Sequence, residues 1–177
     1  MLHAAGALKI DEAATAAEAD SLWKVRKAIS AAVAELMIGK VNEDVVVAPD
    51  RVAELIAATR EIGVRHDVPI VNFGHLGEGN IHATFIIDPR IPGERERADA
   101  AAAELFERVL SMDGSISGEH GIGCTKLPYL ARQIGSETMM LMERIKHELD
   151  PRGLLNPGKK VLSTGVVGSS PAALVET

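Results

Sequence analysis

Four side chains that can bind a metal ion or transfer a proton are concentrated in two short, glycine-rich stretches of the chain. His75 and His82 lie in the first stretch, VNFGHLGEGNIHATFII, and Glu119 and His120 lie in the second, SGEHGIG. Two imidazoles and one carboxylate are a common ligand set of catalytic zinc, which keeps a further position open for water or substrate. We therefore predict that His75, His82 and Glu119 bind a divalent metal, and that His120 is a general base.

The first stretch is predicted to be a β-hairpin, because an apolar run and an alternating apolar run flank a possible turn at Glu78 and Gly79. This pair resembles the Asp-Gly pair of two-residue turns, in which glycine takes a positive φ without steric cost. With that turn, His75 lies directly opposite His82, and their Cβ atoms are about 5 Å apart. Two imidazoles at that separation can bind one metal ion.

The second stretch is predicted to be a Gly/Ser-rich loop that can approach the hairpin closely. Adjacent residues on an extended segment point to opposite sides, so Glu119 can face the metal while His120 faces a bound substrate. The alternative is that the histidines are packed or solvated, that the glycines form ordinary turns, and that Glu78 is a solvated turn residue. The metal-site interpretation is favoured because the other residues of both loops are too small to form a core.

Composition and charge narrow the class of protein. A length of 177 residues suits one domain with its own core, and the 3% aromatic content means that aliphatic residues must build that core. The formal net charge of −6 argues against a nucleic-acid or anionic-membrane partner. The single cysteine, Cys124, excludes an internal disulfide, and the first residues lack the pattern of a signal peptide. We therefore expect a cytoplasmic protein without a transmembrane segment.

The elements expected around the two stretches form an α+β fold. Apolar residues recur at helical spacing on both sides of the hairpin, and β-branched residues cluster before it. Helices would then cover one face of a small, mostly antiparallel sheet that includes the hairpin. The expected elements are a helix over 11–37, a strand over 44–48, a helix from 49, strands over 71–73 and 81–87, and a helix ending near 112.

The last third of the chain differs because Gly, Pro and Asp interrupt its helical segments. A short helix is expected over 125–133 and a longer one over 138–149, followed by an ordered arm, RGLLNPGKK. The final residues lack periodicity and are expected to be disordered. The chain is accordingly divided into an α+β domain over 1–112, a catalytic loop with a C-terminal helical arm over 113–162, and a tail over 163–177.

Five segments together resemble the C-terminal, substrate-binding part of FAD-linked 2-hydroxy-acid oxidoreductases, of the vanillyl-alcohol oxidase-like superfamily. This group includes glycolate oxidase, D-lactate dehydrogenase and D-2-hydroxyglutarate dehydrogenase. The resemblance implies that residues 1–112 are part of a ferredoxin-like cap domain. The segments occur in family order between residues 20 and 161, as LWKVRKAI, NEDVVV, PIVNFGHLGEGNIH, SGEHGIG and DPRGLLNPGKK.

The resemblance implies roles for individual residues. It implies that His75, His82 and Glu119 bind a metal, usually zinc, and that His120 is the base, as the residue types also suggest. In that family a hydride passes from the substrate to the flavin. It also implies that a small 2-hydroxy acid is the substrate. The further residues that it implies are Arg26 and Lys40 for the substrate carboxylate, Asn80 for substrate, and Asn156 for the flavin.

Family members carry an FAD-binding domain before the matching region, and the sequence contains no glycine-rich dinucleotide motif. We therefore expect a separate domain or subunit to supply the FAD, and we expect the chain to be inactive alone. The electron acceptor is not predicted. Two other functions fit the same residues: a stand-alone zinc hydrolase that uses a His2Glu site, and a non-catalytic interaction module.

Overall fold

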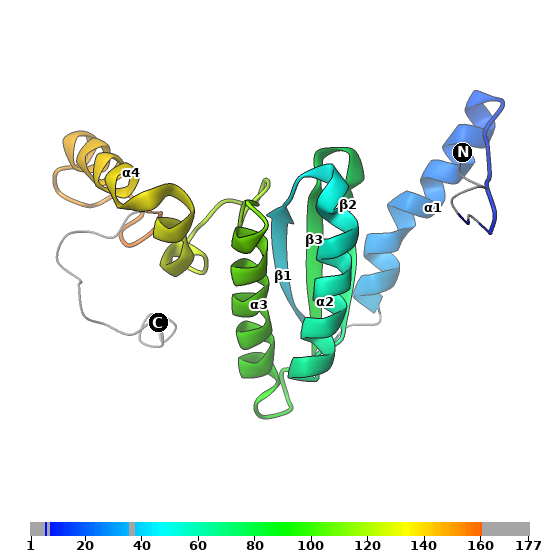
Figure 1. The fold of residues 1–177 in the computed structure, drawn as a ribbon, viewed down its shortest axis with the longest axis horizontal. Helices are drawn as coiled ribbons and strands as arrows, with labels where there is room; N and C mark the ends of the chain where they lie inside the picture. The colour runs from blue at the N-terminus through cyan, green and yellow to red at the C-terminus, as the bar shows by residue number, and fades with distance from the viewer. Residues whose placement is uncertain (1–5, 7, 36–37, 161–177) are drawn as a thin grey trace. The chain divides into compact units, whose positions relative to one another are not determined.

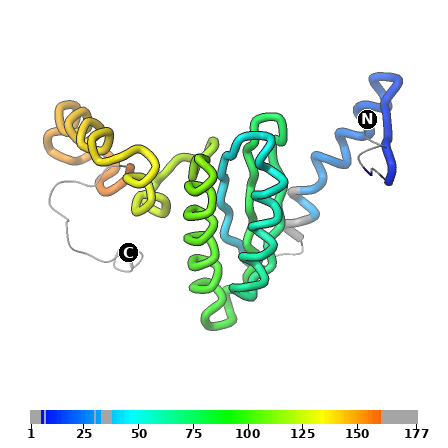
Figure 2. The backbone as a smooth tube through the Cα atoms, viewed as in Figure 1, coloured from blue at the N-terminus to red at the C-terminus, as the bar shows by residue number. Residues whose placement is uncertain are grey.

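The structure is a computed structural model that describes residues 6, 8–35 and 38–160. The tail predicted over 163–177 lies outside the described residues. The chain forms two compact units, residues 1–38 and 39–177, which are described separately. Figure 2 traces the backbone of both units.

The described residues of the first unit form one helix, α1, Ala16–Glu35. It begins later than the expected residue 11 because Thr15 and Glu18 form a capping box. The Thr15 hydroxyl accepts a hydrogen bond from the Glu18 N–H, and the Glu18 carboxylate accepts one from the Thr15 N–H. These bonds satisfy amide groups that a helix leaves unpaired at its first turn. The helix therefore starts where its end groups have partners.

The second unit is built on a three-stranded antiparallel sheet with the strand order β1-β3-β2. The strands are β1 (Gly39–Val46), β2 (Ile70–His75) and β3 (Asn80–Ile87). The strand β1 begins five residues before the predicted start, because the residues before Asp44 pair with β3. The predicted α+β class with a small antiparallel sheet is confirmed.

Two helices, α2 (Val52–His66) and α3 (Glu94–Ser111), pack side by side on one face of this sheet (Figure 1). A short 3-10 turn, Pro49–Arg51, leads into α2. Alternate residues of each strand point toward the helices, so β3 contributes every second side chain to the core. The principal buried side chains are Val41, Val45, Leu55, Ile62, Ile81, Ala83, Phe85, Ile87, Ala98, Leu105, Phe106 and Val109.

The last helix, α4, spans Leu127–Leu149, and its backbone leaves the helical conformation at Gly135. This break separates the two helical segments that the sequence predicts. Beyond α4, the Asp150 carboxylate accepts hydrogen bonds from the N–H groups of Leu154 and Leu155, which orders the start of the arm.

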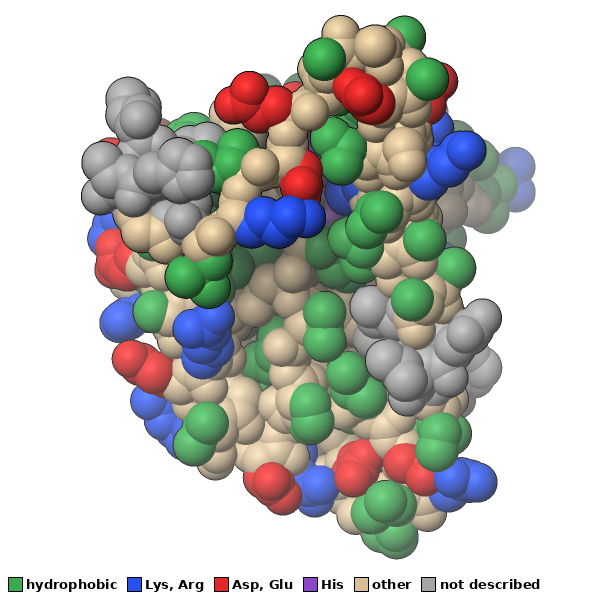
Figure 3. Space-filling view, turned by 90° about the vertical axis from the view of Figure 1, so that its right-hand side faces the viewer, with side chains coloured by type: hydrophobic (Ala, Val, Ile, Leu, Met, Phe, Trp, Pro, Cys, Tyr) green, Lys and Arg blue, Asp and Glu red, His purple; other side chains and the backbone are tan. Residues whose placement is uncertain are grey.

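On the face that Figure 3 draws, basic side chains are interspersed with acidic and hydrophobic ones. Among the helices that the structure describes, none combines the length and the apolar character needed to cross a bilayer. The cytoplasmic location stays a prediction from the sequence.

Candidate functional site

The loop between β2 and β3 contains four residues, 76–79, rather than the two that the sequence suggests. His75 therefore pairs with Asn80, and His82 pairs with Phe73. The predicted direct pairing of His75 with His82 is wrong. The register is displaced by two residues, however, and side chains alternate with a period of two, so both imidazoles still point to the same face. They are diagonal neighbours with ring centroids 5.6 Å apart.

The histidines lie on the sheet face opposite the one that α2 and α3 cover. His82 lies on the central strand, β3, and its partner on the neighbouring strand β1 is Asp44. These two side chains therefore share that face. The Asp44 side chain is fully buried, and His82 is 12% exposed, whereas His75 at the end of β2 is exposed. The side chains of the site are therefore more buried near β1 than near the hairpin loop.

The glycine-rich loop is bound to the sheet through the Asp44 carboxylate. One oxygen, Oδ2, accepts hydrogen bonds from the backbone N–H groups of Gly118, Glu119 and His120, with N···O distances of 2.6, 2.6 and 3.1 Å. The other oxygen, Oδ1, accepts one from the Lys126 ammonium group at 2.7 Å. Successive backbone N–H groups that converge in this way bind an anion strongly. Asp44 thus binds residues 118–120 to β1, and a backbone bridge between Val46 and Ser115 attaches the start of the same segment.

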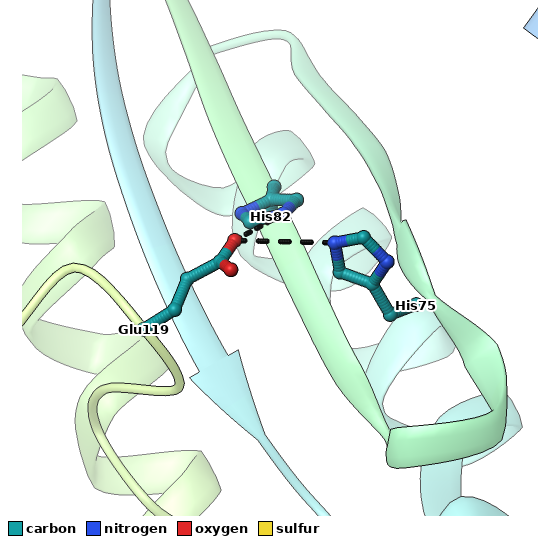
Figure 4. Close-up of side chains that lie close together, drawn as sticks. All are labelled: His75, His82 and Glu119. Carbon is teal, nitrogen blue, oxygen red and sulfur yellow. Dashed lines mark ion pairs between the residues drawn. The ribbon is translucent and has the colours of Figure 1, made fainter.

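With the loop in this position, the Glu119 carboxylate faces the two imidazoles (Figure 4). Its Oε1 atom lies 3.2 Å from Nε2 of His82 and 3.9 Å from Nε2 of His75. One ligand atom from each of the three residues lies within 4.8 Å of the other two. Ligands of tetrahedral zinc at about 2.0 to 2.1 Å from the ion are separated by roughly 3.3 Å. The three residues therefore fit a divalent metal after small side-chain rotations.

His120 lies beside this cluster and is not part of it. Its ring stacks on His82, with centroids 5.2 Å apart and planes inclined by 18°. Nδ1 lies 3.5 Å from Oδ1 of Asp44, and Nε2 lies 3.7 Å from Oε1 of Glu119. The side chain is about half exposed, so the imidazole is accessible to a molecule bound on the open face. This position is suited to a general base.

The surroundings set the ionisation of two of these groups. Burial lowers the pKa of His82; Glu119 opposes this change, while His120 and His75 add to it. A neutral imidazole is the form that binds metals. Burial alone would raise the pKa of the Asp44 carboxyl group, but the hydrogen bonds from Lys126 and the loop backbone hold that pKa well below its usual range. Asp44 therefore stays an anion at neutral pH.

Asn80 is the other predicted site residue that the structure brings to the cluster. It is buried at the start of β3, and its Oδ1 atom has no hydrogen-bond partner among the described residues. Gly118 approaches it so closely that a Cβ atom on Gly118 would lie 2.6 Å from the Asn80 amide nitrogen. A larger residue at 118 would therefore displace the Asn80 amide group.

The remaining predicted residues are Lys40, Arg26 and Asn156, which come from other elements. Lys40 is exposed on β1, four residues before Asp44, which corresponds to about 13 Å along the strand. Arg26 is half-buried on α1, in the first unit. Asn156 lies in the arm and, together with His120, lines a cavity of about 710 Å³ between the loop, α4 and the arm. Their roles stay predictions from the resemblance.

Sequence reasoning missed two residues that shape the site, Asp44 and Lys126. Both are almost completely buried, and the Lys126 ammonium group contacts the Asp44 carbonyl and carboxylate as well as the Glu43 carboxylate. The only signal in the sequence is an acidic pair inside a β-branched strand, which is unusual because buried carboxylates need partners.

The fold is an α+β domain, and one face of its sheet carries His75, His82 and Glu119 close together, with His120 beside them. The chain matches the family model described as FAD linked oxidases, C-terminal domain, over residues 1–160. It belongs to this family.

Curated relatives agree with this assignment. The chain is 38% identical over 153 residues to the glycolate oxidase subunit GlcD of Bacillus subtilis, covering 86% of the chain and 33% of the relative. It is 35% identical over 156 residues to a D-lactate dehydrogenase of Anaerostipes hadrus, covering 88% of the chain and 33% of the relative. A D-2-hydroxyglutarate dehydrogenase of Xanthomonas citri pv. viticola is 39% identical over 151 residues, with 81% and 31% covered. The chain thus spans about a third of the length of these relatives.

Proposed function

We propose that this chain is the C-terminal, substrate-binding part of an FAD-linked dehydrogenase or oxidase of small D-2-hydroxy acids. The observation that carries the proposal is the convergence of His75, His82 and Glu119 beside His120 on one open face. Membership of the family and the names of the relatives, which include a glycolate oxidase subunit and D-lactate dehydrogenases, support the reaction class.

In this proposal each residue has a defined task. His75, His82 and Glu119 hold a divalent metal, with zinc as the first candidate because the donors are two nitrogens and one oxygen. A metal bound there supplies Lewis acidity toward the substrate hydroxyl, and FAD bound to a separate domain or subunit supplies the hydride acceptor. His120 accepts the hydroxyl proton, because its imidazole is accessible and adjacent to the metal ligands.

The substrate carboxylate and the cofactor need further groups. Arg26 and Lys40 are proposed to bind the carboxylate, for which a guanidinium group offers a bidentate geometry. Asn80 is proposed to contact substrate through its unpartnered Oδ1 atom. Asn156 is proposed to contact the flavin from the arm, across the cavity that it shares with His120.

The metal assignment is tested on the purified chain by elemental analysis after dialysis against zinc. About one zinc ion per chain is expected, and the double substitution His75→Ala, His82→Ala is expected to abolish binding. The matched control is His66→Ala, because His66 also contacts a carboxylate, Glu104, but lies between α2 and α3. Equal zinc content in the double variant and the wild type would reject the ligand set.

The reaction class is tested by combining the chain with the FAD-binding part of its enzyme under anaerobic conditions. Glycolate, D-lactate or D-2-hydroxyglutarate is expected to bleach the oxidised flavin, and L-lactate serves as the stereochemical control. If glycolate, D-lactate and D-2-hydroxyglutarate all leave the flavin oxidised in a complex that binds FAD, the proposed reaction is wrong.

A further inference from the structure

Asp44 joins the two halves of the site through a single residue. Its main chain pairs with His82 across β1 and β3, and its carboxylate binds the backbone of residues 118–120. The hairpin and the loop are far apart in the sequence. Asp44 pairs with the hairpin strand β3 and is hydrogen-bonded to the loop. A displacement of Asp44 would therefore move Glu119 relative to both histidines.

The loop needs such an anchor because its own sequence does not define one conformation. Gly118, Gly121 and Gly123 lie within six residues, and the last two adopt positive φ values of 82° and 56°. Glycine-rich segments lose more conformational entropy on ordering than other segments. The Glu119 side chain is 50% exposed, so its position depends on the backbone bonds to Asp44.

Lys126 holds the carboxylate in turn. Its ammonium group donates to the Asp44 carbonyl at 3.0 Å and to Oδ1 at 2.7 Å, and it lies 3.3 Å from the Glu43 carboxylate. Glu43 and Asp44 are consecutive residues of a strand and point to opposite faces. Lys126 therefore reaches around the edge of β1 and compensates the two buried carboxylates, for which an unpaired charge would be costly.

We propose that Asp44, held by Lys126, is the positioning residue of the site: it fixes the 118–120 backbone so that the Glu119 carboxylate reaches His75 and His82 and the His120 imidazole stays beside them. The roles of Glu119 and His120 in this inference rest on the proposed function. The anchoring of the loop does not, because it is carried by the hydrogen bonds to a buried carboxylate.

The test compares Asp44→Asn with the wild-type chain in two measurements. The first is amide hydrogen exchange, in which residues 118–120 are expected to exchange at least tenfold faster in the variant, while the amides of β3 keep their protection and report that the core is folded. The second is zinc affinity by titration calorimetry, expected to fall about 10- to 100-fold, the usual effect of losing a group that orients a ligand.

The matched control is Glu43→Gln. Glu43 is buried on the same strand and shares Lys126, but its side chain faces away from the loop. Both measurements are expected to stay within about twofold of the wild type. If Asp44→Asn does not fold, Asp44→Glu keeps the charge and displaces it by one methylene group, and faster exchange of residues 118–120 is again expected.

The outcomes separate this inference from the proposed function. A folded Asp44 variant with unchanged loop exchange overturns the inference, and so does one that binds zinc as tightly as the wild type. If the wild-type chain binds no zinc but residues 118–120 exchange faster in the variant, the metal assignment fails and the anchoring role of Asp44 stands.

Discussion

Gly79, which ends the loop between β2 and β3, is the position where one methyl group should disturb the site most. Its φ is +71°, a conformation that costs other residues about 1–2 kcal/mol. A Cβ atom at Gly79 would overlap the carbonyl oxygen of Val47. The Gly79 carbonyl also accepts a hydrogen bond from the Val47 N–H at 3.2 Å. Relief of the overlap requires the two backbones to separate.

The expected cost of Gly79→Ala follows from these contacts. The backbone conformation contributes about 1–2 kcal/mol, and loss of the hydrogen bond to Val47 contributes about 1 kcal/mol more. We therefore expect a loss of roughly 3 kcal/mol in the free energy of unfolding, which lowers the Tm by about 10 °C in a unit of this size. Because the loop connects His75 to His82, zinc affinity should fall as well.

Thermal unfolding followed by circular dichroism measures this effect. The control is Gly77→Ala in the same loop, where a Cβ atom meets nothing within 4 Å and φ is not positive. That variant should stay within about 0.5 kcal/mol of the wild type or be slightly stabilised. Equal Tm values for the two variants would refute the reasoning, since they differ only in backbone conformation and overlap.

Two further predictions concern His120 and Glu43. In the enzyme supplied with FAD, His120→Asn should keep its zinc and lower turnover of the hydroxy acid by about 10² to 10⁴, measured by steady-state kinetics and metal analysis; loss of the metal would instead make His120 a ligand. Burial raises the pKa of Glu43 above its ordinary value of 4.5, against the opposing effect of Lys126. The folded state then binds the proton more tightly than the unfolded state, so this contribution to stability is present below pH 4.5 and is lost as the pH rises through the folded pKa. Urea unfolding between about pH 4 and 7 should show the wild type losing stability relative to Glu43→Gln; a difference independent of pH would contradict this.

The sequence predicts the general fold because hydrophobic periodicity reports which face of each element is buried. In α3, for example, the apolar residues that recur at helical spacing, Ala98, Ala102, Leu105, Phe106 and Val109, are all buried. The closeness of His75 and His82 was predicted from a wrong register, and the two residues are still neighbours because an error of two residues preserves the face of every side chain. An error of one residue would have separated the two histidines.

Asp44 and Lys126 could not be predicted in the same way. They are 82 residues apart, and their pairing depends on how the loop passes the edge of β1. Periodicity assigns each residue to a face of its own element, but it does not show which buried charges meet. The four-residue loop was missed for a related reason, because Glu78-Gly79 is compatible with more than one turn length.

The alternation of core-facing and site-facing side chains along β3 has a consequence for strands that pair in a wrong register. Ile81, Ala83 and Phe85 face the core, while His82 and its even-numbered neighbours face the site. A slip of this strand by one residue would expose the aliphatic side chains and bury the imidazole in the core. A misregistered strand would therefore lose the side-chain cluster and expose hydrophobic surface at the same time, and exposed hydrophobic surface is what makes a misfolded chain prone to aggregation and proteolysis.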